Sequence, residues 1–229
     1  MRSRAVDPAA AGPPRAAGRS AAAPPRPSRG DRREASRRRL LDAALSAVAE
    51  LGHGGATTAE IARRAGLSEG MIFKVAPTKS DLLAQSVRDL FSRLVGEYRS
   101  AFAGIDVRTD RVAAAVELLA AAYRRPELMA AFELYLAART DAALARGLRD
   151  VAEWHRAEVR ALAERLFPEA ARTHGRIAAA VDLAMDTLQG EALSRLPNPD
   201  PLRTQRVTAL LADVLRPLLE PAARPGGDR

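Results

Sequence analysis

The sequence contains no cysteine, which excludes disulfide bonds, thiolate catalysis and zinc sites built on cysteine. Aromatic residues make up only 4% of the 229 residues, whereas hydrophobic residues make up 47%. A core must therefore be built mainly from alanine, leucine and valine, which suits packed helices. No apolar run reaches the length of a membrane span, and the N-terminus lacks the apolar segment of a signal peptide. We therefore expect a soluble, cytoplasmic protein with no membrane partner.

Patterns that carry catalysis or bind metals are also missing. His53, His155 and His174 lie far apart, without a metal-type spacing such as HExxH, and no glycine-rich phosphate loop is present. Asp182 and Asp186 are four residues apart on one helix face, a spacing typical of a solvated surface or a helix bundle. We expect no enzymatic activity, no cofactor and no metal site.

Lysine is scarce, because it occurs only at Lys74 and Lys79, and arginine carries the other positive charges. The net charge of +8 lies within residues 1–39, which hold eleven arginines and three acidic residues. Residues 1–30 are mostly Ala, Pro, Gly, Ser and Arg, so this arm is expected to be disordered, as is the tail 221–229. The arm could neutralise DNA phosphates or enter a minor groove. It could equally be a solubilising extension or result from a wrongly assigned start codon.

One stretch predicts two short helices joined by a tight turn. Thr57 can cap the first helix, with Glu60 completing a capping box. Gly66 can end that helix in the left-handed conformation. Ser68 is a second N-cap, for a helix from Glu69 to Val75 that is too short to be stable alone. A short, externally braced helix after a glycine-containing turn is what a helix-turn-helix presents to a DNA major groove.

Residues 37–83 resemble the N-terminal domain of the tetracycline-repressor (TetR) family of bacterial transcription regulators. The matching residues are Leu41, Ala44, Gly52, Thr57, Thr58, Ile61, Ala62, Ala65, Gly66, Leu67, Ser68, Gly70, Pro77, Lys79, Leu82 and Leu83. The sequence departs from the family pattern at Met71, Phe73 and Ala76, where a small hydroxyl residue, a phosphate-binding tyrosine and an aromatic residue are usual. The resemblance implies a three-helix DNA-binding domain over residues 31–78 and a helical effector-binding and dimerisation domain over residues 79–220.

Within this domain, the helix that begins at Glu69 is expected to face DNA, with Ile72 turned to the core. Lys79 lies at the start of the next helix, where its ammonium group and free amides would hold a phosphate. Arg32 and Arg33, which adjoin the start of the first helix, are also expected near DNA. The full predicted DNA-contact set is Arg37, Arg38, Arg39, Thr57, Thr58, Ser68, Glu69, Gly70, Met71, Phe73, Lys74 and Lys79.

The rest of the chain predicts successive helices without any strand pattern. The first helix should begin between Asp31 and Ala35 and continue to Leu51. The later spans are Lys79 to Phe102, Thr109 to Arg124, Pro126 to Ala138, Asp141 to Phe167, Glu169 to Leu196 and Pro201 to Leu219. The resemblance implies that the last two pair with those of a second subunit, which makes a homodimer. Their apolar residues are Ile177, Val181, Leu188, Leu193, Val207, Leu210, Leu211, Val214 and Leu218.

A pocket for an unknown small-molecule effector is expected between the middle helices, since aromatic and methionine residues can line an apolar cavity. Trp154 and His155 are the first candidates for ligand contact, although aromatic and methionine residues are more often plain core in a helical domain. The candidates are Phe102, Tyr123, Met129, Phe132, Tyr135, Trp154, His155 and Met185.

These observations predict an all-α, dimeric, ligand-responsive repressor that binds a palindromic double-stranded DNA operator. Two alternatives stay open. One is a sequence-tolerant DNA-coating protein driven by the arginine arm. The other is a helical interaction module with a vestigial DNA-binding domain.

Overall fold

The computed structural model describes residues 28–104, 110–173 and 175–220, and every regular element among them is a helix. The all-α class predicted from the sequence is therefore confirmed. The helices are α1 (Arg29–Gly55), α2 (Thr58–Ala65), α3 (Glu69–Val75), α4 (Lys79–Ala103), α5 (Arg111–Ala122), α6 (Pro126–Ala137), α7 (Ala142–Leu166), α8 (Pro168–Thr173), α9 (Ile177–Ser194) and α10 (Pro201–Leu219).

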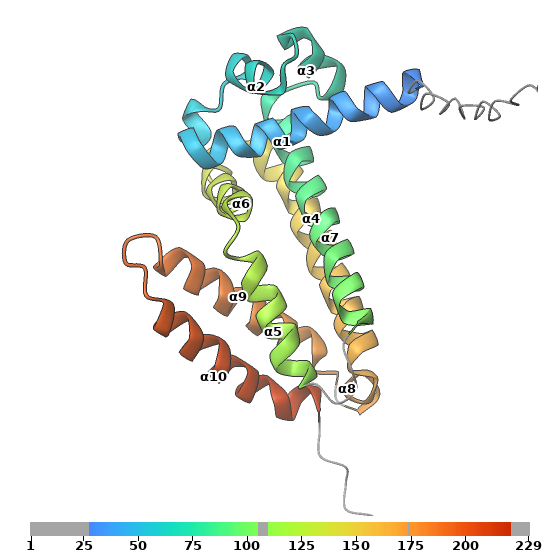
Figure 1. Ribbon diagram of the computed structural model, residues 1–229, viewed down its shortest axis with the longest axis vertical. Helices are drawn as coiled ribbons and strands as arrows, with labels where there is room; N and C mark the ends of the chain where they lie inside the picture. The colour runs from blue at the N-terminus through green and yellow to red at the C-terminus, as the bar shows by residue number, and fades with distance from the viewer. Residues whose placement is uncertain (1–27, 105–109, 174, 221–229) are drawn as a thin grey trace, which may run out of the picture.

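The molecule is elongated, with α1 to α3 at one end and α8 to α10 at the other (Figure 1). Helices α4 and α7, each of 25 residues, run side by side along it and connect the two ends. Helix α6 packs against α1, while α5 packs against α10. The long α4 therefore contributes to both ends of the molecule.

The N-terminal unit, defined as α1 to α3 with the first turns of α4, has its own apolar core. Helix α1 contributes a stripe at helical spacing, and the short helices pack onto it. Ile72 is completely buried, which confirms its predicted orientation. The core residues are Leu40, Leu41, Ala44, Leu45, Ala47, Val48, Ala56, Ile61, Ala62, Ala65, Ile72, Ala76, Leu82 and Leu83.

The caps of the short helices largely follow the sequence prediction. The Thr57 hydroxyl oxygen accepts from the Glu60 backbone N–H (3.2 Å), and Gly66 ends α2 with a φ of 64°. The Glu60 carboxylate does not return to Thr57, so the predicted capping box is only half formed. Ser68 occupies the N-cap of α3 without a side-chain cap hydrogen bond. Helix α3 is thus held by its buried face rather than by its own cap.

Several helix boundaries differ from the prediction, and two of the differences have a clear physical cause. The expected single helix from Glu169 to Leu196 is wrong, because the chain breaks at Gly175 (φ 57°) and forms α8 and α9. Helix α1 begins at Arg29, earlier than expected, because Ser28 and Asp31 form a reciprocal capping box. The predictions for residues 1–27, 105–109 and 221–229 lie outside the described residues.

Replacement of Ile72 with alanine is expected to lower the free energy of unfolding by about 2–5 kcal/mol, because it leaves a cavity under a fully buried side chain. Chemical denaturation followed by circular dichroism measures this. The neighbouring Phe73→Ala is the control, since Phe73 is 59% exposed and its loss should change the free energy of unfolding by no more than about 0.5 kcal/mol. Equal losses for the two variants would contradict the placement of α3.

Candidate nucleic-acid interface

Helix α3 has one buried face and one free face. Ile72 anchors it to the core, whereas Glu69, Gly70, Phe73 and Lys74 are exposed. Phe73 presents a large apolar ring to solvent, with 59% of its surface exposed. The α3 residues predicted to contact DNA therefore share one surface, and the half-buried Met71 lies beside them.

The hydroxyl groups around the turn are divided in their roles. Thr58 Oγ1 donates to Glu69 Oε2 (3.2 Å), which ties the first turn of α2 to the first turn of α3. The exposed Thr57 uses its oxygen as the α2 cap. Ser68 is exposed, and its hydroxyl bonds to none of the residues that the structure describes. Of these three side chains, Ser68 is thus the most available for an external acceptor such as a phosphate.

A basic groove lies between α3 and the first turns of α1. Figure 1 shows α1 extending past α2 and α3. The hollow between them has a volume of about 770 Å³. Its cations Arg32, Arg33, Arg37 and Lys74 come from two helices, and such a lining favours a polyanion. The lining residues are Gly30, Arg32, Arg33, Glu34, Ser36, Arg37, Met71, Lys74 and Val75.

The three consecutive arginines of α1 do not share this groove, because successive helical residues point about 100° apart. Arg37 lines it and pairs with Glu34 (3.6 Å). Arg38 is exposed and lies outside the lining. Arg39 donates to Ser36 Oγ (3.3 Å) and borders a separate shallow hollow beside α2. Only Arg37 of the predicted trio therefore adjoins α3.

Lys79 is placed at the junction of α1 and α4. Its Nζ donates to the backbone oxygen of His53 (2.8 Å). Burial lowers the pKa of Lys79, although Asp141 opposes this shift. An ammonium group has further N–H donors beyond the one used here, so the phosphate contact expected from the sequence stays a prediction.

Helix α2 is fastened to α1 by a network of charges. Glu60 accepts hydrogen bonds from Arg63 (2.8 and 2.7 Å) and Arg64 (2.6 Å). These bonds, from Arg63 first, lower the pKa of Glu60 to about 2. Arg64 also pairs with Glu50 of α1 (2.8 Å). Both guanidinium groups are therefore engaged within the N-terminal unit.

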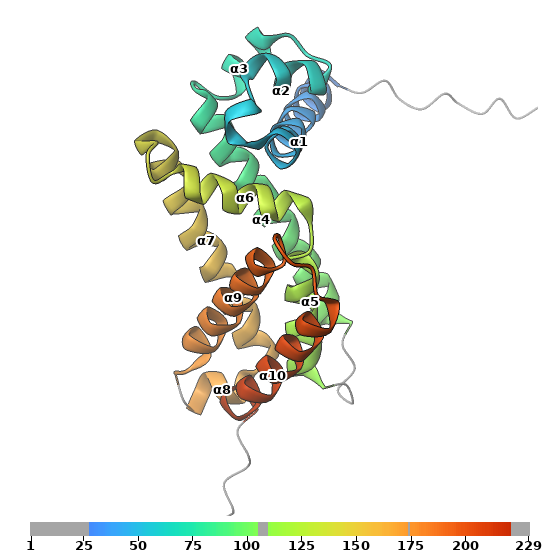
Figure 2. The same ribbon diagram turned by 90° about the vertical axis from the view of Figure 1, so that its left-hand side faces the viewer.

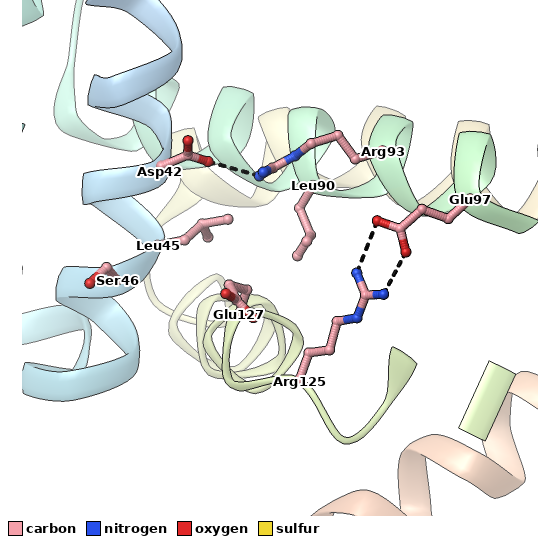
Figure 3. A pocket seen from close by; sticks show the side chains of 8 residues that line it. All are labelled: Asp42, Leu45, Ser46, Leu90, Arg93, Glu97, Arg125 and Glu127. Atoms are coloured by element: carbon pink, nitrogen blue, oxygen red, sulfur yellow. Dashed lines mark hydrogen bonds and ion pairs between the residues drawn. The ribbon is translucent and has the colours of Figure 1, made fainter. Parts of the chain in front are cut away.

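The N-terminal unit meets the rest of the molecule at a polar cleft of about 550 Å³ between α1, α4 and α6. Figure 3 shows Asp42 of α1 directed at Arg93 of α4, and Arg125 directed at Glu97 of α4. Asp42 and Arg93 lie 2.9 Å apart, and Arg125 makes two bonds to Glu97 (3.1 and 2.5 Å). The hydrogen bond from Arg125 lowers the pKa of the Glu97 carboxyl. These pairs connect α1 and α6 to the same face of α4.

A second connection lies at the end of α1. The backbone N–H of His53 donates to Oε1 of Glu133 on α6 (2.5 Å), while the His53 oxygen accepts from Lys79 on α4. The bond is possible because Gly52 adopts a φ of 73° and leaves room for the carboxylate. One peptide segment is thus held by α4 and α6 together.

The structure brings together some of the predicted pocket residues. Tyr123, Phe132, Tyr135, His155 and Met185 line an internal cavity of about 80 Å³. Sequence reasoning did not find the other lining residues, because the packing of several helices brings them together and no local pattern marks them. The other lining residues are Phe91, Tyr98, Leu119, Leu128, Ala152, Arg156 and Gln189.

Three predicted pocket residues lie elsewhere. Trp154 is adjacent to His155 on α7 and therefore points in another direction, with the Arg88 guanidinium 4.8 Å from its ring centroid. Phe102 borders a separate apolar cavity of about 40 Å³. Met129 packs against the core outside the cavity lining. The expectation that Trp154 and His155 both contact a ligand in this cavity does not fit the geometry.

Helices α9 and α10 leave an apolar face uncovered, and Figure 2 turns these helices toward the viewer. Ile177, Val181, Leu188 and Leu211, which were expected on a dimer face, are buried within the subunit. The exposed large apolar residues are Leu183 on α9 (42%), and Leu202 (63%), Leu210 (63%) and Val214 (46%) on α10.

The braced short helix, the glycine turn before it and the basic groove beside it define a helix-turn-helix DNA-binding protein. The family model described as "Bacterial regulatory proteins, tetR family" matches residues 40–85. The uncharacterized HTH-type transcriptional regulator Rv2912c of Mycobacterium tuberculosis is 30% identical over 188 residues, which cover 79% of this chain and 93% of that protein. The HTH-type transcriptional regulator BetI of Escherichia coli (strain K12 / DH10B) is 48% identical over 58 residues, 25% of this chain and 30% of that protein.

Solved structures show the same architecture. A TetR-family transcriptional regulator from Rhodococcus sp. superposes with a TM-score of 0.65 at 19% identity, covering 81% of this chain and 99% of that one. The multidrug binding protein EbrR, solved in complex with imidazole, has a TM-score of 0.58 at 25% identity over 83% of this chain and 98% of that one. The chain belongs to the TetR family of bacterial regulatory proteins and is a DNA-binding transcriptional regulator. No helix among the described residues is long and apolar enough to cross a membrane.

Proposed function

We propose that this chain is a ligand-responsive repressor that binds a palindromic operator as a homodimer. The observation that carries the proposal is the free face of α3, which presents Phe73 and Lys74 beside a groove lined with cations. Apolar contact from Phe73 suits a thymine methyl group, whereas Lys74 suits a guanine or a phosphate. Phosphate contacts from Arg32, Arg33 and Arg37 then fix the position of the helix on the duplex.

The uncovered face of α9 and α10 supports the homodimer. Leu210 and Val214 are four residues apart on one face of α10, and Leu183 of the adjoining α9 is also exposed. If the two-fold axis through this face runs along the long axis of the molecule, the two copies of α3 lie at the same end of the dimer, and the operator then has two-fold symmetry as well. Its half-sites lie about one helical turn, or about 10 base pairs, apart or a multiple of that distance.

The ligand response rests on the path between the internal cavity and the N-terminal unit. Helix α6 carries Phe132 and Tyr135 into the cavity and Glu133 to the backbone of His53. A ligand that moves α6 shifts the same segment that Lys79 attaches to α4. Release then follows if the ligand binds the non-DNA-bound state more tightly. EbrR, which is similar in structure, binds drugs according to its name, and this supports a small-molecule effector here.

Replacement of Glu133 with alanine tests that connection. We expect faster hydrogen exchange at the His53 amide and a free energy of unfolding lower by about 1.5–3 kcal/mol, because a hydrogen bond to a charged acceptor is lost. Glu133→Gln keeps an acceptor and should lose less. Exposed Glu127 on the same helix provides the matched control, since Glu127→Ala should leave the exchange unchanged. Unchanged exchange in Glu133→Ala would show that α6 does not hold this segment.

Selection of genomic fragments by the purified full chain tests the proposed function, with a second selection by a chain lacking residues 1–27. Both proteins should enrich the same fragments and protect two symmetric half-sites in footprinting. Enrichment that disappears with the arm, without any preferred site, would show instead a sequence-tolerant DNA-coating protein. Failure of both proteins to retard any fragment would show a helical interaction module.

A further inference from the structure

The internal cavity carries information about the chemistry of its ligand. Its lining comes from α4, α5, α6, α7 and α9, together with Tyr123 just after the end of α5. We propose that it binds an uncharged aromatic molecule of one ring, with a hydroxyl group that hydrogen-bonds to the imidazole of His155. This inference rests on the proposed ligand response, because it names the class of ligand for that response.

The size of the cavity sets the first limit on the ligand. Its volume is about 80 Å³. A cavity of about 150 Å³ is large enough to hold benzene. A single ring is therefore the largest group that fits with modest adjustment of the lining, whereas fused ring systems require a rearranged core.

His155 provides a hydrogen-bonding group that the protein leaves unused. The residue is only 7% exposed, and its ring stacks on Phe91 with the centroids 4.1 Å apart. Its buried Nδ1 has no hydrogen-bond partner among the described residues. Burial, with a smaller contribution from Arg156, lowers the pKa of His155 to about 4, so the ring is neutral at pH 7. A neutral imidazole has one accepting nitrogen, and a ligand hydroxyl supplies its donor.

The tyrosines of the lining complement such a hydroxyl. The hydroxyl groups of Tyr98, Tyr123 and Tyr135 form no hydrogen bond with the residues that the structure describes. Burial raises the pKa of Tyr135 to about 12 and also raises the pKa values of Tyr98 and Tyr123. All of them remain protonated at neutral pH. They can therefore donate to a ligand oxygen while that oxygen donates to His155.

Aromatic side chains form the walls for the ring itself. Tyr123 and Phe132 have their ring centroids 5.6 Å apart, and Phe132 and Tyr135 have theirs 6.4 Å apart. Met185 closes the lining from α9, and methionine sulfur contacts aromatic rings favourably. These walls favour a flat aromatic ligand over a branched aliphatic one.

The charges at the cavity disfavour an ionic ligand. Arg156 is the only charged side chain among the described lining residues. It is already paired with Asp182 (2.8 Å) and Asp186 (3.1 Å) of α9. A cationic ligand would be repelled by this guanidinium group, and the described lining contains no carboxylate to balance its charge. An anion would have to compete with the two aspartates, so an uncharged molecule is favoured.

Isothermal titration calorimetry of the full chain with four one-ring probes tests the class of ligand. The probes are 4-methylphenol, toluene, 4-methylbenzoate and benzylammonium. We expect 4-methylphenol to bind about fivefold more tightly than toluene, as one added hydrogen bond between neutral groups provides. The two ions should bind at least about tenfold more weakly than 4-methylphenol, because the cavity offers them no free counter-charge.

The variant His155→Phe keeps a flat stacking ring but removes the nitrogen. Its preference for 4-methylphenol over toluene should fall, because only the tyrosine hydroxyls remain to bond the ligand oxygen, while its toluene affinity should stay that of the natural chain. Trp154→Phe is the matched control on the same helix, and it should retain the preference for 4-methylphenol. Circular dichroism confirms that both variants fold before they are titrated.

Two results would overturn the inference. One is tighter binding of either ion than of 4-methylphenol, and the other is an unchanged phenol preference in His155→Phe. In either case the proposed ligand response can still hold for another class of compound. If 4-methylphenol binds as expected but does not release operator DNA, the assignment of the ligand class stands and the proposed ligand response fails.

Discussion

The double variant Phe73→Ala and Lys74→Ala is expected to lose about 10³-fold in operator affinity while it retains its fold. Both side chains lie on the exposed face of α3, so their removal leaves the core intact. The proposed dimer loses both of them from each subunit. At about 1 kcal/mol for each contact, the lower end of the range for base contacts, the loss reaches about 4 kcal/mol. Fluorescence anisotropy with a labelled operator measures it.

A matched control separates this effect from a general change in surface. Leu136 on α6 is exposed (62%) to about the same extent as Phe73, and Arg149 on α7 is an exposed cation distant in sequence from α3. The double variant Leu136→Ala and Arg149→Ala should bind the operator as the natural chain does. If Phe73→Ala and Lys74→Ala together cost less than about tenfold, α3 is not the element that contacts the bases.

The second large effect is expected at the uncovered face of α9 and α10. Replacement of both Leu210 and Val214 with glutamate should convert the dimer to a monomer at micromolar concentration. The charged groups would have to lie within an apolar interface and, across a two-fold axis, face their own copies. Operator affinity should fall with dimerisation, because each half-site is then bound alone. Analytical ultracentrifugation measures the mass.

The control for this experiment is Leu136→Glu, which places the same charge at an equally exposed apolar site on α6. That variant should remain dimeric. A natural chain that is monomeric at all accessible concentrations, or a double glutamate variant that stays dimeric, would show that this face is not the interface between subunits.

The helix-turn-helix was predictable from the sequence because its signals are local. Thr57, Gly66 and Ser68 mark helix ends by their own backbone preferences, and the structure places all of them at those ends. The buried orientation of Ile72 follows from helical spacing alone. The basic groove was only partly predictable, because it depends on the angle at which α1 passes α3.

The internal cavity was harder to predict, since its lining is set by the packing of several helices. Composition picked out Tyr123, Phe132 and His155, yet it could not separate His155 from Trp154, which faces Arg88 instead. The ion pair of Asp182 with Arg156 joins residues 26 positions apart, so no local sequence pattern could predict it. The two aspartates were expected to face solvent or a helix bundle. They form ion pairs with a residue that lines the cavity.

The sequence contains a local signal for the break between α8 and α9, but the helical periodicity on both sides of it favoured a single helix. Gly175 interrupts a stretch rich in alanine, and its positive φ ends the helical path. The contact of Glu133 with His53 had no such signal, because it joins residues 80 positions apart. Long-range hydrogen bonds of this kind need the tertiary structure before they can be seen.

A competition titration tests most directly whether α3 reads DNA sequence. The purified protein, bound to a fragment recovered by selection, is challenged with unlabelled duplex of the same or of random sequence at about 0.15 M salt, where nonspecific phosphate attraction is reduced. We predict that the random duplex competes at least about 10³-fold less well than the selected one. Equal competition by the two duplexes would contradict sequence reading by this protein.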